Sequence, residues 1–178
     1  MKVCYSNPYN REKNIGKSLN EFCDMVPGDS WIVLQDGDIM YLTDYWGTQI
    51  EDIIAKNADY DLIGCMTNRL KHNHQLYLGK FSDDSDIRNH IGVAEQLHSS
   101  DYDTVEHTEK PIAGMFMLFP KITWTKHRFK ENSPTFDTHF SRAIQRTGGK
   151  VGIAKGLYVF HKYRMGKPDP KTNDKHLK

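Results

Sequence analysis

The 178-residue chain has few cysteines, no long apolar run and almost no net charge. Cys4, Cys23 and Cys65 show no paired spacing, so we interpret them as reduced core residues of an intracellular protein. A formal net charge of +1 gives no overall basic surface for nucleic acid. No apolar run approaches membrane-spanning length, and residues 1–4 are not typical of a signal peptide. We therefore expect a cytoplasmic protein without a transmembrane segment and without a nucleic-acid partner.

The chain also lacks internal repeats and low-complexity segments, and its length suits one domain with a sizeable core. We predict a single domain over residues 1–164. From Lys162 onward the sequence carries six Lys or Arg against two Asp, and it holds two prolines but no apolar periodicity. Residues 165–178 are therefore expected to form a flexible basic tail.

The most informative stretch is residues 30–38, where a short apolar run ends in two carboxylates. Residues 31–34 are apolar on both faces of a strand, which is typical of a central, buried strand. Asp36-Gly37-Asp38 follows directly. Ligands of open α/β sheets gather at the carboxyl ends of strands, and hard oxygen ligands suit magnesium or manganese ions that carry substrate phosphates. The alternative interpretation is an ordinary Asp-Gly turn.

Helix and strand patterns alternate along the chain, which predicts an α/β sandwich with a mixed, mainly parallel central sheet. The two most apolar strands, 31–34 and 115–119, are expected to be interior and close together. The expected helices cover about 14–25, 44–57, 87–97 and 134–147; the expected strands cover 3–5, 31–34, 61–66, 111–120, 151–153 and 157–160; a loop is expected over 99–110.

Two polar features in this scheme have more than one interpretation. Asn14 can cap the first helix, but Gly16 is out of place in its first turn. A close ligand, a close neighbouring backbone or a tolerated surface glycine would each explain Gly16. His72 and His74 lie two residues apart, and we interpret them as solvent-exposed rather than as metal ligands.

Asp137 and His161 are the other candidates for chemistry. Asp137 follows Ser133-Pro134 near the start of a helix, where it either complements the helix dipole or lies at the mouth of a cleft. His161 follows a strand directly, as Asp38 does, and is either a surface residue or a nitrogen ligand of a divalent ion. If both are ligands, their side chains should approach to roughly 3–5 Å.

Taken in order, these motifs resemble family 2-like glycosyltransferases of the GT-A fold. The resemblance covers about residues 14–164, with a loose middle over 71–110. The end of the chain resembles the valine-x-histidine-x-x-arginine motif of the polypeptide N-acetylgalactosaminyltransferase branch. The matching residues are Asn14-x-Gly16, Asn20, Asp36-Gly37-Asp38, Gly114 with its apolar strand, Phe136-Asp137 and Val159-x-His161-x-x-Arg164.

The resemblance implies transfer of a sugar from a nucleotide-diphosphate sugar, such as a UDP- or GDP-sugar, to a hydroxyl acceptor. It implies a manganese or magnesium ion held by Asp38 and His161, with Asp36 on the metal or on the nucleotide ribose. Asp137 would meet the acceptor hydroxyl or the donor sugar. The residues implied around the donor are Asn14, Gly16 and Asp36, with Lys13, Lys162 and Arg164 as candidates for the phosphate charge.

The sequence departs from this family in two places. Related enzymes begin with further strand–helix units that hold the nucleobase, so the base pocket here is shortened or rebuilt from residues 7–9 and Lys13. The usual glutamate-aspartate pair is Phe136-Asp137, which leaves one acid. Two alternatives therefore stay open: a catalytically inactive relative that binds nucleotide sugars, and another metal-dependent nucleotide-using transferase. The second class more often shows a glycine- and arginine-rich phosphate loop, which is not found here.

Overall fold

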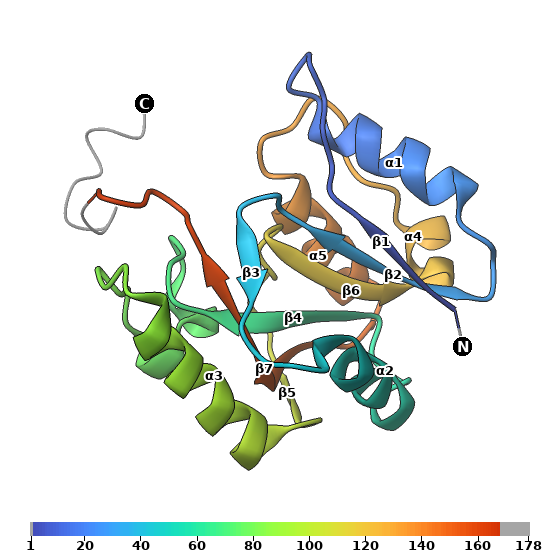
Figure 1. Cartoon of the computed structure of the whole chain (residues 1–178). Coiled ribbons are helices and arrows are strands. Elements are labelled where there is room, and N and C mark those ends of the chain that lie inside the picture. The colour runs from blue at the N-terminus through green and yellow to red at the C-terminus, as the bar shows by residue number, and fades with distance from the viewer. Residues whose placement is uncertain (1, 168–178) are drawn as a thin grey trace.

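A computed structural model, which describes residues 2–167, shows an α/β protein built on one seven-stranded sheet (Figure 1). The strand order is β1-β2-β6-β4-β7-β3, and β5 pairs with β7. Strands β1, β2, β4 and β7 point one way, whereas β3, β5 and β6 run antiparallel to them. The prediction of an α/β fold with a mixed sheet is confirmed. None of the helices within residues 2–167 is long and apolar enough to cross a membrane.

The elements alternate along the chain much as the apolar periodicity predicts. The strands are β1 (Lys2–Ser6), β2 (Ser30–Gln35), β3 (Ile39–Tyr41), β4 (Leu62–Thr67), β5 (Val105–His107), β6 (Phe116–Pro120) and β7 (Val151–His161). The helices are α1 (Ile15–Met25), α2 (Trp46–Lys56), α3 (Ile87–Asp101), α4 (Lys121–Lys126) and α5 (Phe136–Arg146), with short 3₁₀ turns η1 (Asn73–Gln75) and η2 (Tyr77–Gly79).

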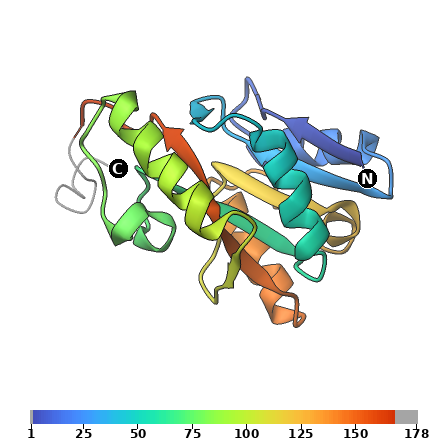
Figure 2. The ribbon, with the colours of Figure 1, turned by 60° about the horizontal axis from the view of Figure 1, so that its bottom comes forward.

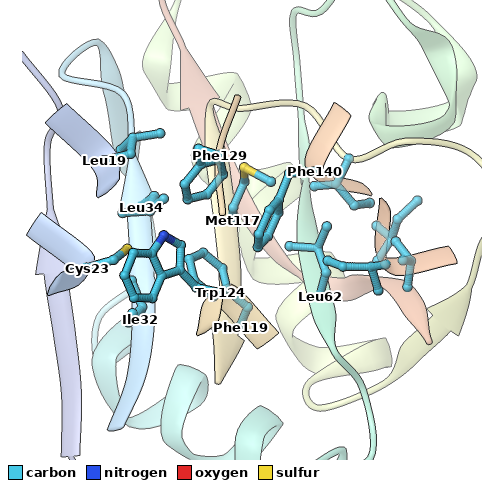
Figure 3. Packing of buried hydrophobic residues seen from close by; sticks show 14 of the residues in the cluster. Leu19, Cys23, Ile32, Leu34, Leu62, Met117, Phe119, Trp124, Phe129 and Phe140 are labelled. Atoms are coloured by element: carbon cyan, nitrogen blue, oxygen red, sulfur yellow. The ribbon is translucent and has the colours of Figure 1, made fainter. Parts of the chain in front are cut away.

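The two most apolar strands are direct neighbours inside the sheet, as predicted. β2 and β6 pair antiparallel, with Ile32 opposite Phe119 and Leu34 opposite Met117. Because side chains alternate across a strand, these four residues share one face of the sheet. Figure 3 shows them packed beneath side chains of α1, α4 and α5. Those covering side chains include Leu19, Cys23, Trp124 and Phe140.

The intervening strand residues form a second core on the opposite face. Val33 and Leu118 pack there with Ile50, Ile53 and Ile54 of α2. Figure 2 shows α2 and α3 in front of the sheet, and α3 packs along β7. Helices therefore cover both faces of the sheet. Polar side chains lie at the strand ends, in the loops that follow the strands.

Two strands differ from the sequence prediction. The expected loop over 99–110 is wrong in part, because α3 continues to Asp101 and β5 then pairs with β7. β5 consists of Val105-Glu106-His107, which has no apolar alternation, so only its backbone pairing identifies it. The two strands expected at 151–153 and 157–160 are one strand, β7, whose register against β4 shifts between Cys65 and Met66.

Two helix starts and one short strand also differ from expectation. α5 begins after Thr135 rather than Ser133, and the Ser133 hydroxyl instead accepts a hydrogen bond from the Thr135 N–H at 3.4 Å. α2 begins after Tyr45, which has a left-handed backbone conformation, and not after Thr43 or Asp44. Strand β3 was not predicted, because three residues are too few to show a period.

Candidate functional site

The segment Asp36-Gly37-Asp38 carries the chain from β2 to β3. The Asp36 N–H donates to the Met115 carbonyl at 2.9 Å and so closes the β2–β6 pairing. Asp38 then joins β7, because its carbonyl accepts a hydrogen bond from the Lys162 N–H at 3.0 Å. The antiparallel register of β3 and β7 pairs Ile39 with His161, which puts Asp38 beside the end of β7.

This pairing brings three of the predicted metal ligands together. The Asp38 Oδ1 and His161 Nε2 atoms lie 3.3 Å apart, within the expected range. One potential ligand atom from each of Asp36, Asp38 and His161 lies within 4.8 Å of the others. Two carboxylates and one imidazole form a donor set that suits manganese or magnesium. The Asp38 side chain is 49% exposed, so the cluster is open to solvent on one side.

His161 is held in the form that a metal ligand requires. Its ring is 4% exposed, and its Nδ1 donates to the Arg69 carbonyl at 3.0 Å. Nε2 therefore carries the free lone pair of the neutral ring and faces Asp38, as in metal sites whose histidines are oriented by a backbone carbonyl. Burial lowers the pKa of His161 despite the nearby Asp38. A lone pair and a carboxylate oxygen that face each other at this distance need a proton or a cation between them.

The Asp36 carboxyl group lies close to two other carboxylates. Burial raises the pKa of its carboxyl to about 6, and the nearby Asp38 and Asp137 carboxylates add to the effect. Two carboxylates that disfavour the ionised form of a third, Asp36, make this a favourable place for a divalent cation. The side chains of Asp36 and Asp38 thus fit the magnesium or manganese ion that the sequence predicts at the end of β2.

Asp36→Asn is expected to stabilise the metal-free protein near pH 8 by up to about 3 kcal/mol. The substitution removes a carboxylate whose pKa is higher in the folded state, and a pKa difference of one unit corresponds to about 1.4 kcal/mol. The folded pKa is about 6, above the unfolded value of 3.8, so the folded state retains a proton that the unfolded state has lost. Unfolding in this window therefore releases a proton, and wild-type stability should fall as the pH rises from about 4 through about 6. Urea unfolding of both proteins with a chelator at pH 4 and pH 8 measures this.

The stabilisation should shrink near pH 4, where Asp36 is protonated in the folded wild type. An equal effect at both pH values would show that the substitution acts through packing. No stabilisation at pH 8 would show that neither burial nor the neighbouring carboxylates penalise the ionised form of Asp36.

Asp137 faces the same cluster from the start of α5. Its Oδ2 accepts the Gly114 N–H at 2.9 Å, and its Oδ1 accepts the N–H of Thr138. Gly114 leaves room for this contact, since a Cβ there would lie 2.8 Å from the Phe136 ring and 3.4 Å from the Asp137 Cβ. Gly114 therefore helps to position the Asp137 carboxylate.

A cleft of about 480 Å³ joins these residues into one site. Asp36, Asp38 and His161 lie in it together with Asp137, which is the arrangement expected of a metal cluster and a separate acid. The cleft has room for a sugar or a phosphate group. Its remaining walls come from loops and from the first turns of α1 and α5, and they include Pro8, Ile15, Leu70, Lys71, His72, Met115, Pro134, Thr135, Thr138 and Tyr163.

The structure also assigns supporting roles to residues that the sequence does not single out. Asn68 accepts the His161 N–H on its Oδ1 at 2.7 Å, and the Tyr163 ring stacks near His161 with a centroid distance of 5.5 Å. Asn68 and Arg69 follow β4 directly, at the same edge of the sheet as Asp36. Their position directly after a strand is the sequence signal that could have identified them as site residues, because an asparagine and an arginine alone do not indicate a site. His72 is exposed, as predicted, and lines the cleft, whereas the prediction is wrong for His74, which is half-buried and bonds the Pro111 carbonyl.

Asn14 and Gly16 take structural roles outside the residues that line the cleft. Asn14 caps α1, as predicted, because its Oδ1 accepts the Lys17 N–H at 3.2 Å. The same oxygen accepts the Asn132 N–H at 2.8 Å. Gly16 packs against the Lys130 backbone, where a Cβ would overlap the carbonyl oxygen. Of the three explanations for Gly16, the close neighbouring backbone is the one found, and the expected donor contact is not supported.

The expected phosphate-binding cations, Lys13, Lys162 and Arg164, are not among the residues that line the cleft. Lys13 is exposed and has a left-handed backbone, with φ of 60°. Arg164 has φ of 51° and lies in a turn after β7, where its carbonyl accepts the Lys167 N–H at 2.8 Å. Residues 165–167 complete this turn, and the rest of the predicted tail, 168–178, lies outside the described residues.

Neither a scan against protein-family models nor a search of curated proteins finds a match to this chain. The site is therefore interpreted from its own geometry.

Proposed function

We propose that the protein is a metal-dependent glycosyltransferase that moves a sugar from a nucleotide-diphosphate sugar to a hydroxyl acceptor. The observation that supports this most is the cluster of Asp36, Asp38 and His161 within 4.8 Å, in one cleft with Asp137. A cation site and a separate acid are the two parts that this transfer requires. The GT-A-like arrangement of the fold is part of the same proposal.

The chemistry assigns a role to each part of the cleft. The bond between the sugar anomeric carbon and the phosphate oxygen breaks, and the nucleoside diphosphate leaves with the electron pair. The acceptor oxygen forms the new bond to the anomeric carbon and loses its proton. A bound divalent ion supplies Lewis-acid stabilisation of the leaving diphosphate. Asp36, Asp38 and His161 would hold that ion.

Asp137 is the acid placed to act on the acceptor. In an inverting transfer its carboxylate takes the hydroxyl proton, while in a retaining transfer it orients the donor sugar. The Gly114 and Thr138 N–H groups each bond one of its oxygens, so the carboxylate is fixed and still has lone pairs for a substrate. Stereochemistry of the product distinguishes the two roles.

A thermal-shift screen of UDP- and GDP-sugars tests the proposal. A ligand that binds only the folded state raises the melting temperature, and saturation at about 100 times Kd adds about 2.7 kcal/mol of stability. We expect one donor to raise the melting temperature with manganese present and to have little effect with a chelator. Transfer of radiolabelled sugar from that donor to a mixture of saccharide acceptors then tests turnover.

The alternatives give different results in the same experiment. A catalytically inactive relative would bind the donor with manganese but show neither transfer nor donor hydrolysis. Another nucleotide-using transferase would be stabilised by nucleoside triphosphates in preference to nucleotide sugars. No metal-dependent shift with any nucleotide would refute the proposal.

A further inference from the structure

A second cavity of about 290 Å³ adjoins the cleft on the Asp137 side. His72 and Thr138 line both spaces, so the two are adjacent. Thr138 follows Asp137 in α5, whereas none of the three metal-cluster residues lines the second cavity. We call this space the basic cavity because of the residues that line it: His72, Asn73, His74, Lys110, Pro111, Thr138 and Arg142.

The basic cavity has the opposite charge to the cleft beside it. Four of its lining residues are Lys, Arg or His, and none carries a carboxylate. Within residues 2–167 neither Lys110 nor Arg142 makes an ion pair. The overall charge of the chain is only +1, so this concentration is local. Unpaired cations around a concave space attract anions there.

Three segments that are distant in sequence build this cavity, and hydrogen bonds fix them to one another. The Ile112 N–H donates to the Ser141 Oγ at 3.0 Å, which attaches the segment after Lys110 to α5. The Ala113 N–H donates to the Gln75 Oε1 at 2.9 Å, which attaches it to η1. Arg142 lies one helical turn after Thr138, so both side chains share one face of α5. These hydrogen bonds hold the backbone segments that carry the cationic side chains in fixed positions relative to one another.

His74 adds a donor that responds to an anion. Its Nε2 donates to the Pro111 carbonyl at 2.8 Å, which leaves Nδ1 as the site for a second proton. Burial lowers the pKa of His74, and nearby Lys110 and His72 lower it further. Lys110 and His72 therefore lie close enough to His74 to disfavour its protonated form. An anion among them would relieve this repulsion.

We propose that the basic cavity binds an anionic group, a phosphate or a carboxylate, carried by the acceptor whose hydroxyl meets Asp137. This inference rests on the proposed function for the identity of the reaction, but the anion site itself rests on the cavity. The donor diphosphate belongs at Asp36, Asp38 and His161, on the other side of Asp137. An anionic group beyond Asp137 is therefore placed on the acceptor side. The acceptor class is an acidic saccharide or a phosphorylated one.

Inorganic phosphate is the probe that isolates this site. In the metal-free protein the three carboxylates of the cleft repel phosphate, so binding there does not compete. We expect phosphate to shift the His74 side-chain resonances in NMR titrations. Lys110→Gln and Arg142→Gln should each weaken phosphate binding by about tenfold, the usual value of one charge-assisted hydrogen bond. Lys126→Gln, which removes an exposed cation from another cavity, is the matched control and should leave binding unchanged.

Equal weakening by all three substitutions, or by none, would overturn the anion site. A second titration separates the acceptor from the donor as its source. Phosphate is added to protein loaded with manganese and UDP or GDP. Unchanged phosphate affinity, together with normal nucleotide affinity of Arg142→Gln, supports an acceptor subsite. Displacement of phosphate by the nucleotide would overturn it, because the cavity would then hold the donor diphosphate.

The two proposals fail in different ways. If no nucleotide binds, the proposed function fails and the acceptor assignment fails with it, while the metal-free titration still decides whether the cavity binds anions. If the nucleotide binds and the metal-free titration shows no specific phosphate binding, only the anionic acceptor subsite is refuted.

Discussion

Asp137→Asn is expected to lower the rate of sugar transfer by roughly 10²–10⁴-fold, the usual contribution of a positioned acid or base. The amide has no basicity at physiological pH, so it cannot take the acceptor proton. Donor affinity should stay near the wild-type value, because Asp36, Asp38 and His161 remain unchanged. Transfer rate and donor affinity, measured side by side on the donor from the thermal-shift screen, give this comparison.

The substitution also has a structural cost that must be separated from the chemical one. The carboxylate accepts the Gly114 and Thr138 N–H groups on its two oxygens, and an amide has only one oxygen to offer. A loss of stability of about 1–3 kcal/mol is therefore expected for the N–H left without a partner. Unfolding curves of the variant show whether it is fully folded under the assay conditions.

Asp86→Asn is the matched control for a carboxylate at the start of a helix. Asp86 caps α3, where its Oδ1 accepts the Arg88 N–H at 3.0 Å, and it does not line the cleft. This variant should lose some stability and retain full transfer activity. Similar activities for Asp137→Asn and Asp86→Asn would reduce Asp137 to a helix-start residue and leave the proposed mechanism without its acid.

The sequence predicts the core of this fold well because its strongest signals are local. The run at 31–34 and the run at 115–119 are apolar on both faces, so their burial side by side follows from pattern alone. Asn14 was recognised as a helix cap because capping depends on one side chain and the adjacent backbone. β3 and β5 were missed because they are three residues long and are held by pairing with β7, which is distant in sequence.

Part of the candidate site is predicted from the sequence because its residues also carry a local signal. Asp38 follows β2 and His161 ends β7, and the ends of strands that share one direction meet at one edge of the sheet. The register of β3 on β7, which sets their 3.3 Å separation, has no local signature. At Gly16 the sequence signal is ambiguous, because a glycine in a first helical turn fits either a close ligand or a close neighbouring backbone. The position of the Lys130 backbone shows that the second explanation applies. The basic cavity could not be predicted, because its cations come from three separated segments.

Asp38→Ala is expected to abolish the manganese-dependent rise in melting temperature, and with it the binding of a nucleotide sugar, while leaving the fold intact. The Asp38 side chain is half exposed and takes no part in the core. Its backbone carbonyl, which accepts the Lys162 N–H, is retained in alanine, so the β3–β7 pairing survives. The proposed cation, however, would lose one of its three protein ligands, the one that faces the His161 lone pair. Asp38 is a cleaner choice than His161, whose removal would leave a buried cavity and an unpaired Arg69 carbonyl.

Asp44→Ala is the control for the loss of one negative charge near the same loop. Asp44 is exposed, follows β3 in the chain and lies outside the three-residue cluster. Manganese titrations monitored by thermal shift should therefore give a wild-type response for Asp44→Ala and none for Asp38→Ala. In the wild type, metal at about 100 times Kd should add about 2.7 kcal/mol of stability. A full response from Asp38→Ala, or an equal loss in both variants, would show that manganese binds elsewhere or only through general charge. The cleft would then have no cation with which to hold a diphosphate.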